Sequence, residues 1–280
     1  MTNIYGSVGY TLLRNKYNTI LIFADVHSKL PYCYNKIDIS DWFKDNMNFT
    51  NVLLEEVPRD GVELNELWTE SDHTQKLKNL FLQNSNLIHA IDIRPYLIPF
   101  SWEMCELKND NNIITLNNYL KKISIFLELE DDYFKKKLSL VYNEKYLMKN
   151  VHLGKHFLEL HILFNLYKEK YAKYMEKNVC DIFKENKSIL EEFNNILDST
   201  MEWFAIAKMF QLKFNKKNVI MHTGLYHSDN IRNKLMELYD YKIIDNNGIN
   251  TIKDIENNKN YNGCISLSPS VTSQLSIINN

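Results

Sequence analysis

Four short apolar runs stand out along the chain, with between two and five successive apolar residues and no strict alternation with polar ones. Short apolar segments of this kind are typical of strands buried on both faces, as in a parallel sheet covered by helices. The pattern therefore predicts an α/β core. The predicted strands comprise residues 18–28, 50–58, 87–95 and 217–224.

A long stretch between the third and fourth runs, about 113–212, repeats apolar residues at three- and four-residue spacing. This spacing predicts several helices, which we expect to form a lid or substrate subdomain. The segment "NIRNKLMELYDYKIID" after the fourth run predicts a helix and then a strand, and "CISLSP" predicts a final edge strand. The expected fold is a mixed, largely parallel sheet flanked by helices, with a large helical insertion before the last core strands.

These elements divide the chain into three regions. Residues 1–112 form the first part of the α/β core, and residues 113–212 form the helical insertion. Residues 213–280 complete the core and end in a C-terminal tail.

Composition narrows the classes of function. The 280 residues carry a formal net charge of -2, so no basic excess favours a nucleic-acid partner. No run approaches the roughly 20 apolar residues of a membrane helix, and the N-terminus does not resemble a signal peptide. We expect a soluble, cytoplasmic protein that acts on a small molecule or a peptide, and a homo-oligomer is compatible with the sequence.

The four cysteines are widely spaced and form no C-x-x-C pair. They predict four free thiols in a reducing compartment. Heavy use of Asn, Lys and Ile indicates an AT-rich genome, as in large DNA viruses and some protists, and a viral source would add the virion as a location.

Charged or imidazole side chains follow each predicted strand. In open α/β sheets, ligands bind beyond the carboxyl ends of the strands, so we expect these groups to meet at one edge. They are Asp25 and His27, then Glu55 and Glu56, then Asp92 and Arg94, and finally His227.

Two imidazoles and one carboxylate at this edge can hold a divalent transition metal and leave positions for water. The sequence thus predicts a site for Mn, Co, Zn or Fe with His27, Glu55 and His227 as ligands. Glu56 is the alternative to Glu55 if the strand register shifts by one residue. A bound metal would lower the pKa of its water and polarise a carbonyl, which is hydrolase chemistry.

At these residues the chain resembles the TraB/TIKI family and its erythromycin-esterase and ChaN-like relatives. That family carries two G-x-x-H motifs and an intervening glutamate. The second motif is present as Gly224-Leu225-Tyr226-His227, whereas the first appears as Ala24-Asp25-Val26-His27, with Ala in place of Gly. The resemblance implies a metal-dependent peptidase or esterase, with Glu55 as the glutamate.

The resemblance also implies roles for three further residues. Asp25 would orient His27 or assist the attacking water. Asp92 and Arg94 match the family's A-x-D-R-type segment, and Arg94 would stabilise an oxyanion or fix a substrate carboxylate. From the residues alone, a structural ion pair that lines the site, on one side of a strand, is a better explanation of Asp92 and Arg94 than direct catalysis.

The other histidines have simpler explanations. His222 within the fourth strand is interpreted as a half-buried histidine bonded to backbone, and His89 as structural. His152 and His156 share a helix face at a spacing that can bind metal, but "HLGKHFLELH", which includes His161, is no H-E-x-x-H motif.

Two other classes of function remain open. The altered first motif is compatible with a catalytically inactive structural or host-interaction protein that keeps the fold. The ChaN-like resemblance implies a third class, a binder of a small haem-like ligand. Metal-free general-base hydrolysis is a variant of the first hypothesis, as the erythromycin-esterase relatives imply.

Overall fold

The computed structural model of the chain describes residues 2–26, 33–58, 75–106, 114–212, 218–257 and 263–276. The chain forms two compact units. The first, here called the sheet unit, comprises Met1–Glu56, Glu70–Ile91 and Leu212–Asn280. The second, the helical unit, comprises Val57–Thr69 and Asp92–Gln211.

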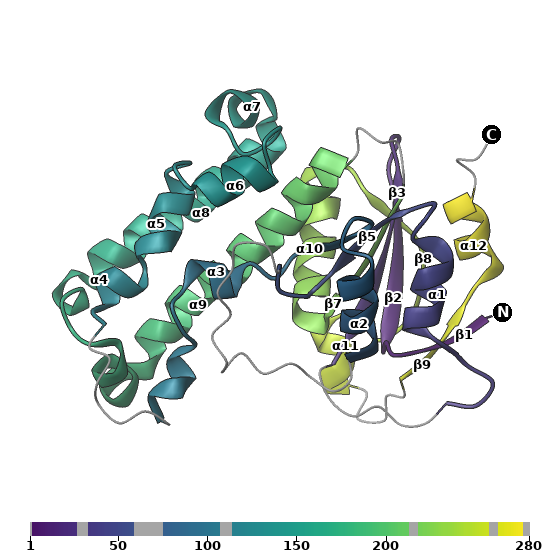
Figure 1. Cartoon of the computed structure of the whole chain (residues 1–280), viewed down its shortest axis with the longest axis horizontal. Helices are drawn as coiled ribbons and strands as arrows, with labels where there is room; N and C mark the ends of the chain where they lie inside the picture. Colours follow the sequence, from purple (N-terminus) through teal and green to yellow (C-terminus); the bar gives the residue numbers. More distant parts are fainter. Residues whose placement is uncertain are drawn as a thin grey trace. The chain divides into compact units, whose positions relative to one another are not determined.

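A six-stranded sheet forms the centre of the sheet unit, with the strand order β6-β5-β7-β3-β2-β8 (Figure 1). The four strands from β6 to β3 are mutually parallel. At the other side of the sheet, β2 is antiparallel to β3, and β8 is antiparallel to β2. These four parallel strands are the four apolar runs, so the predicted α/β core is confirmed. Their bounds are β3 (Thr19–Asp25), β5 (Asn51–Leu54), β6 (Ile88–Ala90) and β7 (Val219–Gly224).

The remaining strands come from the N-terminal and C-terminal parts of the chain. β2 (Gly9–Arg14), which the sequence did not predict, forms a hairpin with β3, and the predicted β8 (Lys242–Gly248) pairs with β2. A separate three-stranded sheet has the order β4-β1-β9. It consists of β1 (Thr2–Tyr5), β4 (Ile37–Asp38) and β9 (Cys264–Leu267), the last being the predicted edge strand.

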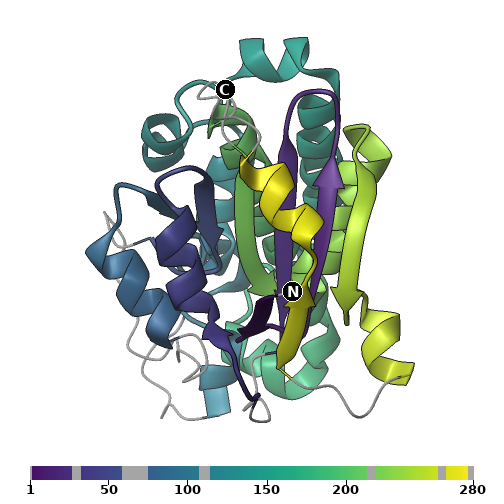
Figure 2. The ribbon, with the colours of Figure 1, turned by 90° about the vertical axis from the view of Figure 1, so that its right-hand side faces the viewer.

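Helices cover both faces of the six-stranded sheet because alternate strand residues point to opposite sides. One face carries a core of strand residues such as Phe23 and Leu54 packed against Phe43, Phe81 and Val271. Those partners belong to α1 (Ile39–Asn46), α2 (Gln75–Gln83) and α12 (Pro269–Ser276). In Figure 2, α1 (dark blue) and α12 (yellow) lie in front of the strands. The helix α10 (Leu225–Leu238) contacts β3 and β7, and α11 (Ile252–Asn257) contacts α10.

The helical unit is built around two long helices, α8 and α9, which meet through rings such as Phe164 and Phe193 (Figure 1). Its aromatic residues form a core in which Phe126 contacts Phe134, Tyr142 and Trp203. The elements are α3 (Arg94–Leu97), η2 (Trp102–Glu106), α4 (Leu116–Tyr119), α5 (Lys121–Leu127), α6 (Asp132–Lys137), α7 (Glu144–Lys149), α8 (Val151–Lys170), η3 (Ala172–Tyr174) and α9 (Val179–Leu212).

The third predicted strand is shorter than its apolar run. β6 ends at Ala90, and Arg94 already begins α3, with Pro95 in the first helical turn. Proline has no N–H to donate to a strand ladder and is favoured at the start of a helix. The sequence predicted that Asp92 and Arg94 share one side of a strand. This prediction is wrong, because both residues lie beyond the end of β6.

The prediction of four free thiols is wrong. Cys33 is bonded to Cys264 within the sheet unit, and Cys105 to Cys180 within the helical unit. The pairs are 231 and 75 residues apart in sequence, so no local motif could reveal them. Among the helices of the described ranges, none combines the length and apolarity needed to cross a membrane.

Candidate functional site

The carboxyl ends of β3, β5 and β7 meet at one edge of the sheet. In the parallel ladder Asp25 is the register partner of Gly224, and Leu54 is the partner of His222. The backbone N–H of Glu55 donates to the carbonyl of His222 over 3.0 Å, which continues the ladder by one residue beyond β5. Glu55 is thereby placed beside the end of β7.

Glu55 links this edge to the turn that begins α10. Its Oε2 accepts the backbone N–H of Gly224 at 2.6 Å, and its Oε1 lies 3.7 Å from Nε2 of His227. The side chains of Glu55 and His227 are only 8% and 7% exposed. Because few water molecules screen the two groups, their electrostatic interaction is stronger than that of a surface pair.

His227 owes its position to the strand–turn–helix layout of "VIMHTGLYH". Gly224 ends β7 and caps α10, so His227 falls in the first helical turn. Gly224 has φ -53°, a value open to any residue, so its backbone conformation does not explain the choice of glycine. The ring of Tyr226 packs edge-on against the imidazole, with the centroids 5.4 Å apart.

Two hydroxyl groups brace the same turn. Thr223 Oγ1 and Ser228 Oγ are hydrogen-bonded at 2.7 Å, and Ser228 Oγ donates to the carbonyl of Thr223 at 3.1 Å. Both residues are buried. The bonds connect the last residues of β7 to the start of α10, and they fix the orientation of the turn that carries His227.

An ion pair that the sequence analysis did not single out fixes α10 further along. Arg232 NH2 lies 2.5 Å from Asp229 Oδ1, and Arg232 NH1 donates to the carbonyl of Asn250. Asp229 Oδ2 accepts the backbone N–H of Ile252. The i, i+3 spacing of acid and base in "DNIR" was a visible signal for this pair.

Only part of the predicted metal set can be located. His27 lies outside the described residues, while Glu55 and His227 come together as the sequence predicted. Their donor atoms, 3.7 Å apart, fit two ligands of one ion, whose bonds are about 2.0–2.2 Å long. Within the described ranges no group of three His, Cys, Asp or Glu side chains could hold a metal.

Two further acids, Asp25 and Glu56, are buried at the same edge of the sheet. Asp25 ends β3 and is 1% exposed, at the register position beside Gly224. Glu56 is buried as well, but Glu55 is the residue that contacts both Gly224 and His227.

Asp92 and Arg94 belong to the helical unit. The ion pair between them is present, with Nε of Arg94 2.8 Å from Oδ1 of Asp92. Arg94 NH1 also lies 2.8 Å from Asp198 Oδ1 on α9, and Asp198 Oδ2 accepts a hydrogen bond from Asn194. This network joins α3 to α9, so the arginine is held by two carboxylates, of which the sequence indicated one.

The other histidines follow their simpler explanations. His222 is 3% exposed, and its Nε2 donates to the carbonyl of Gly6 at 3.0 Å. His152 is exposed on α8 whereas His156 is buried, so they do not present one surface site. His89 lies in β6 as the register partner of Leu53.

The chain was compared with known proteins at three levels. No family model, no curated protein and no solved structure matches it.

Proposed function

We propose that the chain is a hydrolase of the TraB/TIKI type whose catalytic centre is built on Glu55 and His227. The observation that carries this proposal is the buried carboxylate–imidazole contact of 3.7 Å at the carboxyl edge of three parallel strands. Such edges are the usual ligand-binding positions of open α/β sheets. The strand–G-x-x-H–helix layout at residues 219–238 supports the family resemblance.

In this proposal each residue has a distinct task. His227 accepts a proton from the attacking water as a general base. The carboxylate of Glu55 stabilises the imidazolium that results, because the opposite charges are close and poorly screened. Gly224 holds the carboxylate through its N–H, so Glu55 needs no rearrangement when the charge on His227 develops.

In the metal-dependent form of the proposal, which is an alternative to the general-base role, Glu55 and His227 would be two ligands of a divalent metal, with His27 as the third. When bound, such an ion would polarise the scissile carbonyl and lower the pKa of its water. Asp25 would then orient a ligand histidine. We propose a peptide or an ester as the substrate, since both carry a carbonyl open to attack by water.

The test is hydrolysis of a panel of peptides and esters with and without added Mn, Co, Zn or Fe. We expect His227→Ala and Glu55→Ala each to lower turnover about 100-fold or more, the scale at which general acid–base groups contribute. His152→Ala, a change at an exposed histidine of α8, is the matched control and should leave turnover unchanged. The assignment is wrong if both site variants retain full activity.

The same preparation discriminates between the classes of function. Elemental analysis that finds one metal per chain, lost in His227→Ala, supports the hydrolase. A haem absorption band would instead support a ligand binder. Correctly folded protein with neither metal, haem nor turnover would support a structural or host-interaction role.

The two disulfides bear on where this activity takes place. Disulfides persist in secreted proteins and on virion or cell surfaces, whereas the cytosol keeps thiols reduced. We infer from the paired cysteines a non-reducing location, in place of the cytoplasm that the sequence predicted.

A further inference from the structure

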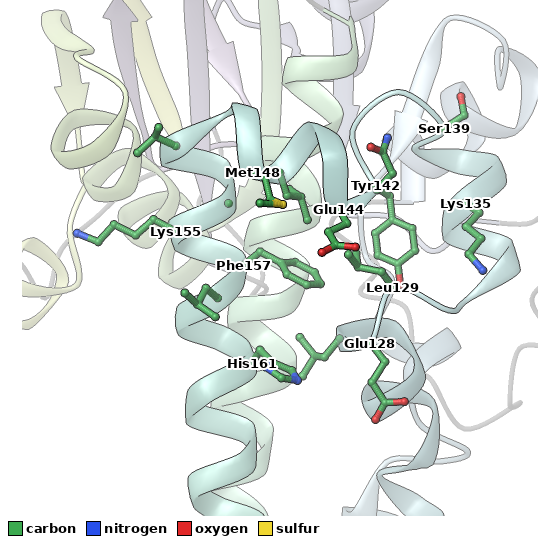
Figure 3. A pocket seen from close by; sticks show the side chains of 16 residues that line it. Glu128, Leu129, Lys135, Ser139, Tyr142, Glu144, Met148, Lys155, Phe157 and His161 are labelled. Carbon is green, nitrogen blue, oxygen red and sulfur yellow. The ribbon is translucent and has the colours of Figure 1, made fainter.

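The helical unit contains a cavity of about 970 Å³ between α7, α8 and the segment that joins α5 to α6 (Figure 3). Its volume is at the upper end of the range usual for small-molecule sites, about 300–1,000 Å³. All of its lining residues belong to the helical unit, so it is independent of the pair Glu55 and His227.

The inner wall of the cavity is apolar and aromatic. Tyr142 and Phe157 line it, and both rings pack on Trp203, which makes the wall part of the aromatic core. Both are nearly fully buried, at 2% and 7% exposure. The wall is therefore preformed and would accept a rigid aromatic group or an alkyl chain without first being ordered.

The mouth of the cavity exposes large apolar side chains to water. Met148, Val151 and Leu158 line it and are 76%, 70% and 55% exposed. Contiguous exposed apolar surface of this kind marks ligand-binding grooves and contact sites. An apolar body seated in the cavity would cover these side chains.

The lining lysines are turned away from the cavity. In Figure 3 the side chains of Lys135 and Lys155 extend outward on opposite sides. Lys135 lies 3.7 Å from Asp132 and donates to the carbonyl of Glu130, and Lys155 lies 3.9 Å from Glu159. Their charges are therefore already compensated by carboxylates on their own segments.

The lining glutamates are placed differently from the lysines. In Figure 3 the carboxylate of Glu144 is directed toward the space beside Phe157, and that of Glu128 extends downward at the lower end of the view. Glu128 accepts a hydrogen bond from Ser124, which leaves its second oxygen for another donor. Within the ranges that the structure describes, the carboxylate of Glu144 makes no hydrogen bond or ion pair. Both glutamates are exposed, so their negative charge lies at the open side of the cavity, in front of its aromatic wall.

We propose that this cavity binds an amphipathic organic cation, that is, an amine or quaternary ammonium group attached to an alkyl or aromatic body. The apolar part lies against Phe157 and covers Leu158. The positive group lies between Glu144 and Glu128, where the aromatic rings add to its binding through cation–π attraction. An anionic head group would meet two carboxylates and no inward-facing lysine.

The test uses three probes with the same ten-carbon chain: decyltrimethylammonium, decanol and decanoate. Each is titrated calorimetrically into the full-length protein below its solubility limit or micelle concentration. We expect decyltrimethylammonium to bind about tenfold more tightly than decanoate, with decanol between them, since exposed charge pairs contribute modestly to binding. Equal affinities for all three, tighter binding of decanoate, or no binding of any probe would overturn the proposal.

Substitutions of lining residues test whether the cation binds in this cavity. Glu144→Gln should weaken the binding of decyltrimethylammonium about threefold and leave the binding of decanol unchanged. The double variant with Glu128→Gln should weaken the binding of decyltrimethylammonium about tenfold. Leu158→Lys, a change at an exposed position, should abolish binding of the cation. Glu176→Gln is the matched control, an exposed glutamate that does not line the cavity. If Glu144→Gln and Leu158→Lys bind the cation as the unmodified protein does, the cavity is not its site.

Discussion

Glu55 accepts the backbone N–H of Gly224, a residue 169 positions further along the chain, at 2.6 Å. This one bond attaches the end of β5 to the turn that carries His227. The carboxylate is therefore a structural part of the turn as well as the neighbour of the imidazole, and the two roles can be separated by substitution.

Glu55→Ala should lower the free energy of unfolding by about 1–3 kcal/mol, because it leaves a buried N–H without its acceptor. Glu55→Gln keeps a carbonyl oxygen for Gly224 and should cost less than about 1 kcal/mol, although it removes the negative charge beside His227. Urea denaturation of both variants gives the comparison. Equal stability of Glu55→Ala and the unmodified protein would mean that the bond does not hold the turn.

Gly154→Ala should destabilise the helical unit. A Cβ at this position of α8 would lie 2.2 Å from the carbonyl oxygen of Leu147, which is backbone and cannot swing away. Such overpacking costs about 1–3 kcal/mol. Thermal unfolding followed by circular dichroism measures the loss. Val151→Ala, at an exposed position of the same helix, is the control and should leave the melting temperature nearly unchanged.

The protein denatured without reductant should contain no titratable thiol, and four after reduction, because all four cysteines are paired. Replacing Cys105 and Cys180 together by Ser should lower the free energy of unfolding by about 2–4 kcal/mol, since the cross-link restricts the unfolded chain. Thiol titration and chemical denaturation provide the two measurements. Four reactive thiols in unreduced protein would contradict the pairing.

The lowered pKa of Lys208 on α9 predicts that the free energy of unfolding depends on pH. Burial, assisted by the nearby charge of Lys137, lowers the pKa of Lys208 to about 8. Below pH 8 both the folded and unfolded states carry this proton, and the cost of the buried charge is fully present. Between pH 8 and about 10.5 only the unfolded state keeps the proton, so this contribution to stability rises with pH.

Lys208→Met should therefore raise the free energy of unfolding at pH 7 by about 1–3 kcal/mol. This difference between the variant and the unmodified protein should decrease as the pH approaches 10. Denaturation of both proteins at several pH values measures the difference. Lys145→Met, at an exposed lysine, is the control and should show no such advantage. A constant difference across this range would contradict the assignment to the buried ammonium.

The parallel core could be predicted because its signal is local. Each of β3, β5, β6 and β7 lies in a short segment rich in apolar residues, and the carboxyl ends of parallel strands meet at one edge by topology alone. That rule brings Glu55 to His227 although no local contact joins them. It does not select between Glu55 and Glu56, which depends on the register that β5 adopts against β7.

What the sequence did not reveal depends on contacts between distant segments. β2 is recognised as a strand mainly through its pairing with β3 and β8, and a cysteine pair 231 residues apart has no motif. The second partner of Arg94, Asp198, lies 104 positions away on α9. Local pattern placed an acid and a base together at Asp92 and Arg94, but it assigned them to a strand that Pro95 brings to an end.

The place of β7 in the sheet has a consequence for synthesis of the chain. β7 lies between β5 and β3, yet it follows the whole helical unit in sequence. While the nascent chain lacks residues 219–224, β6 with β5 and β3 with β2 are two separate pieces, each with an open edge. The helical unit and its cysteine pair are complete earlier, so the chain emerges from the ribosome with its inserted part ready to fold before the part that surrounds it.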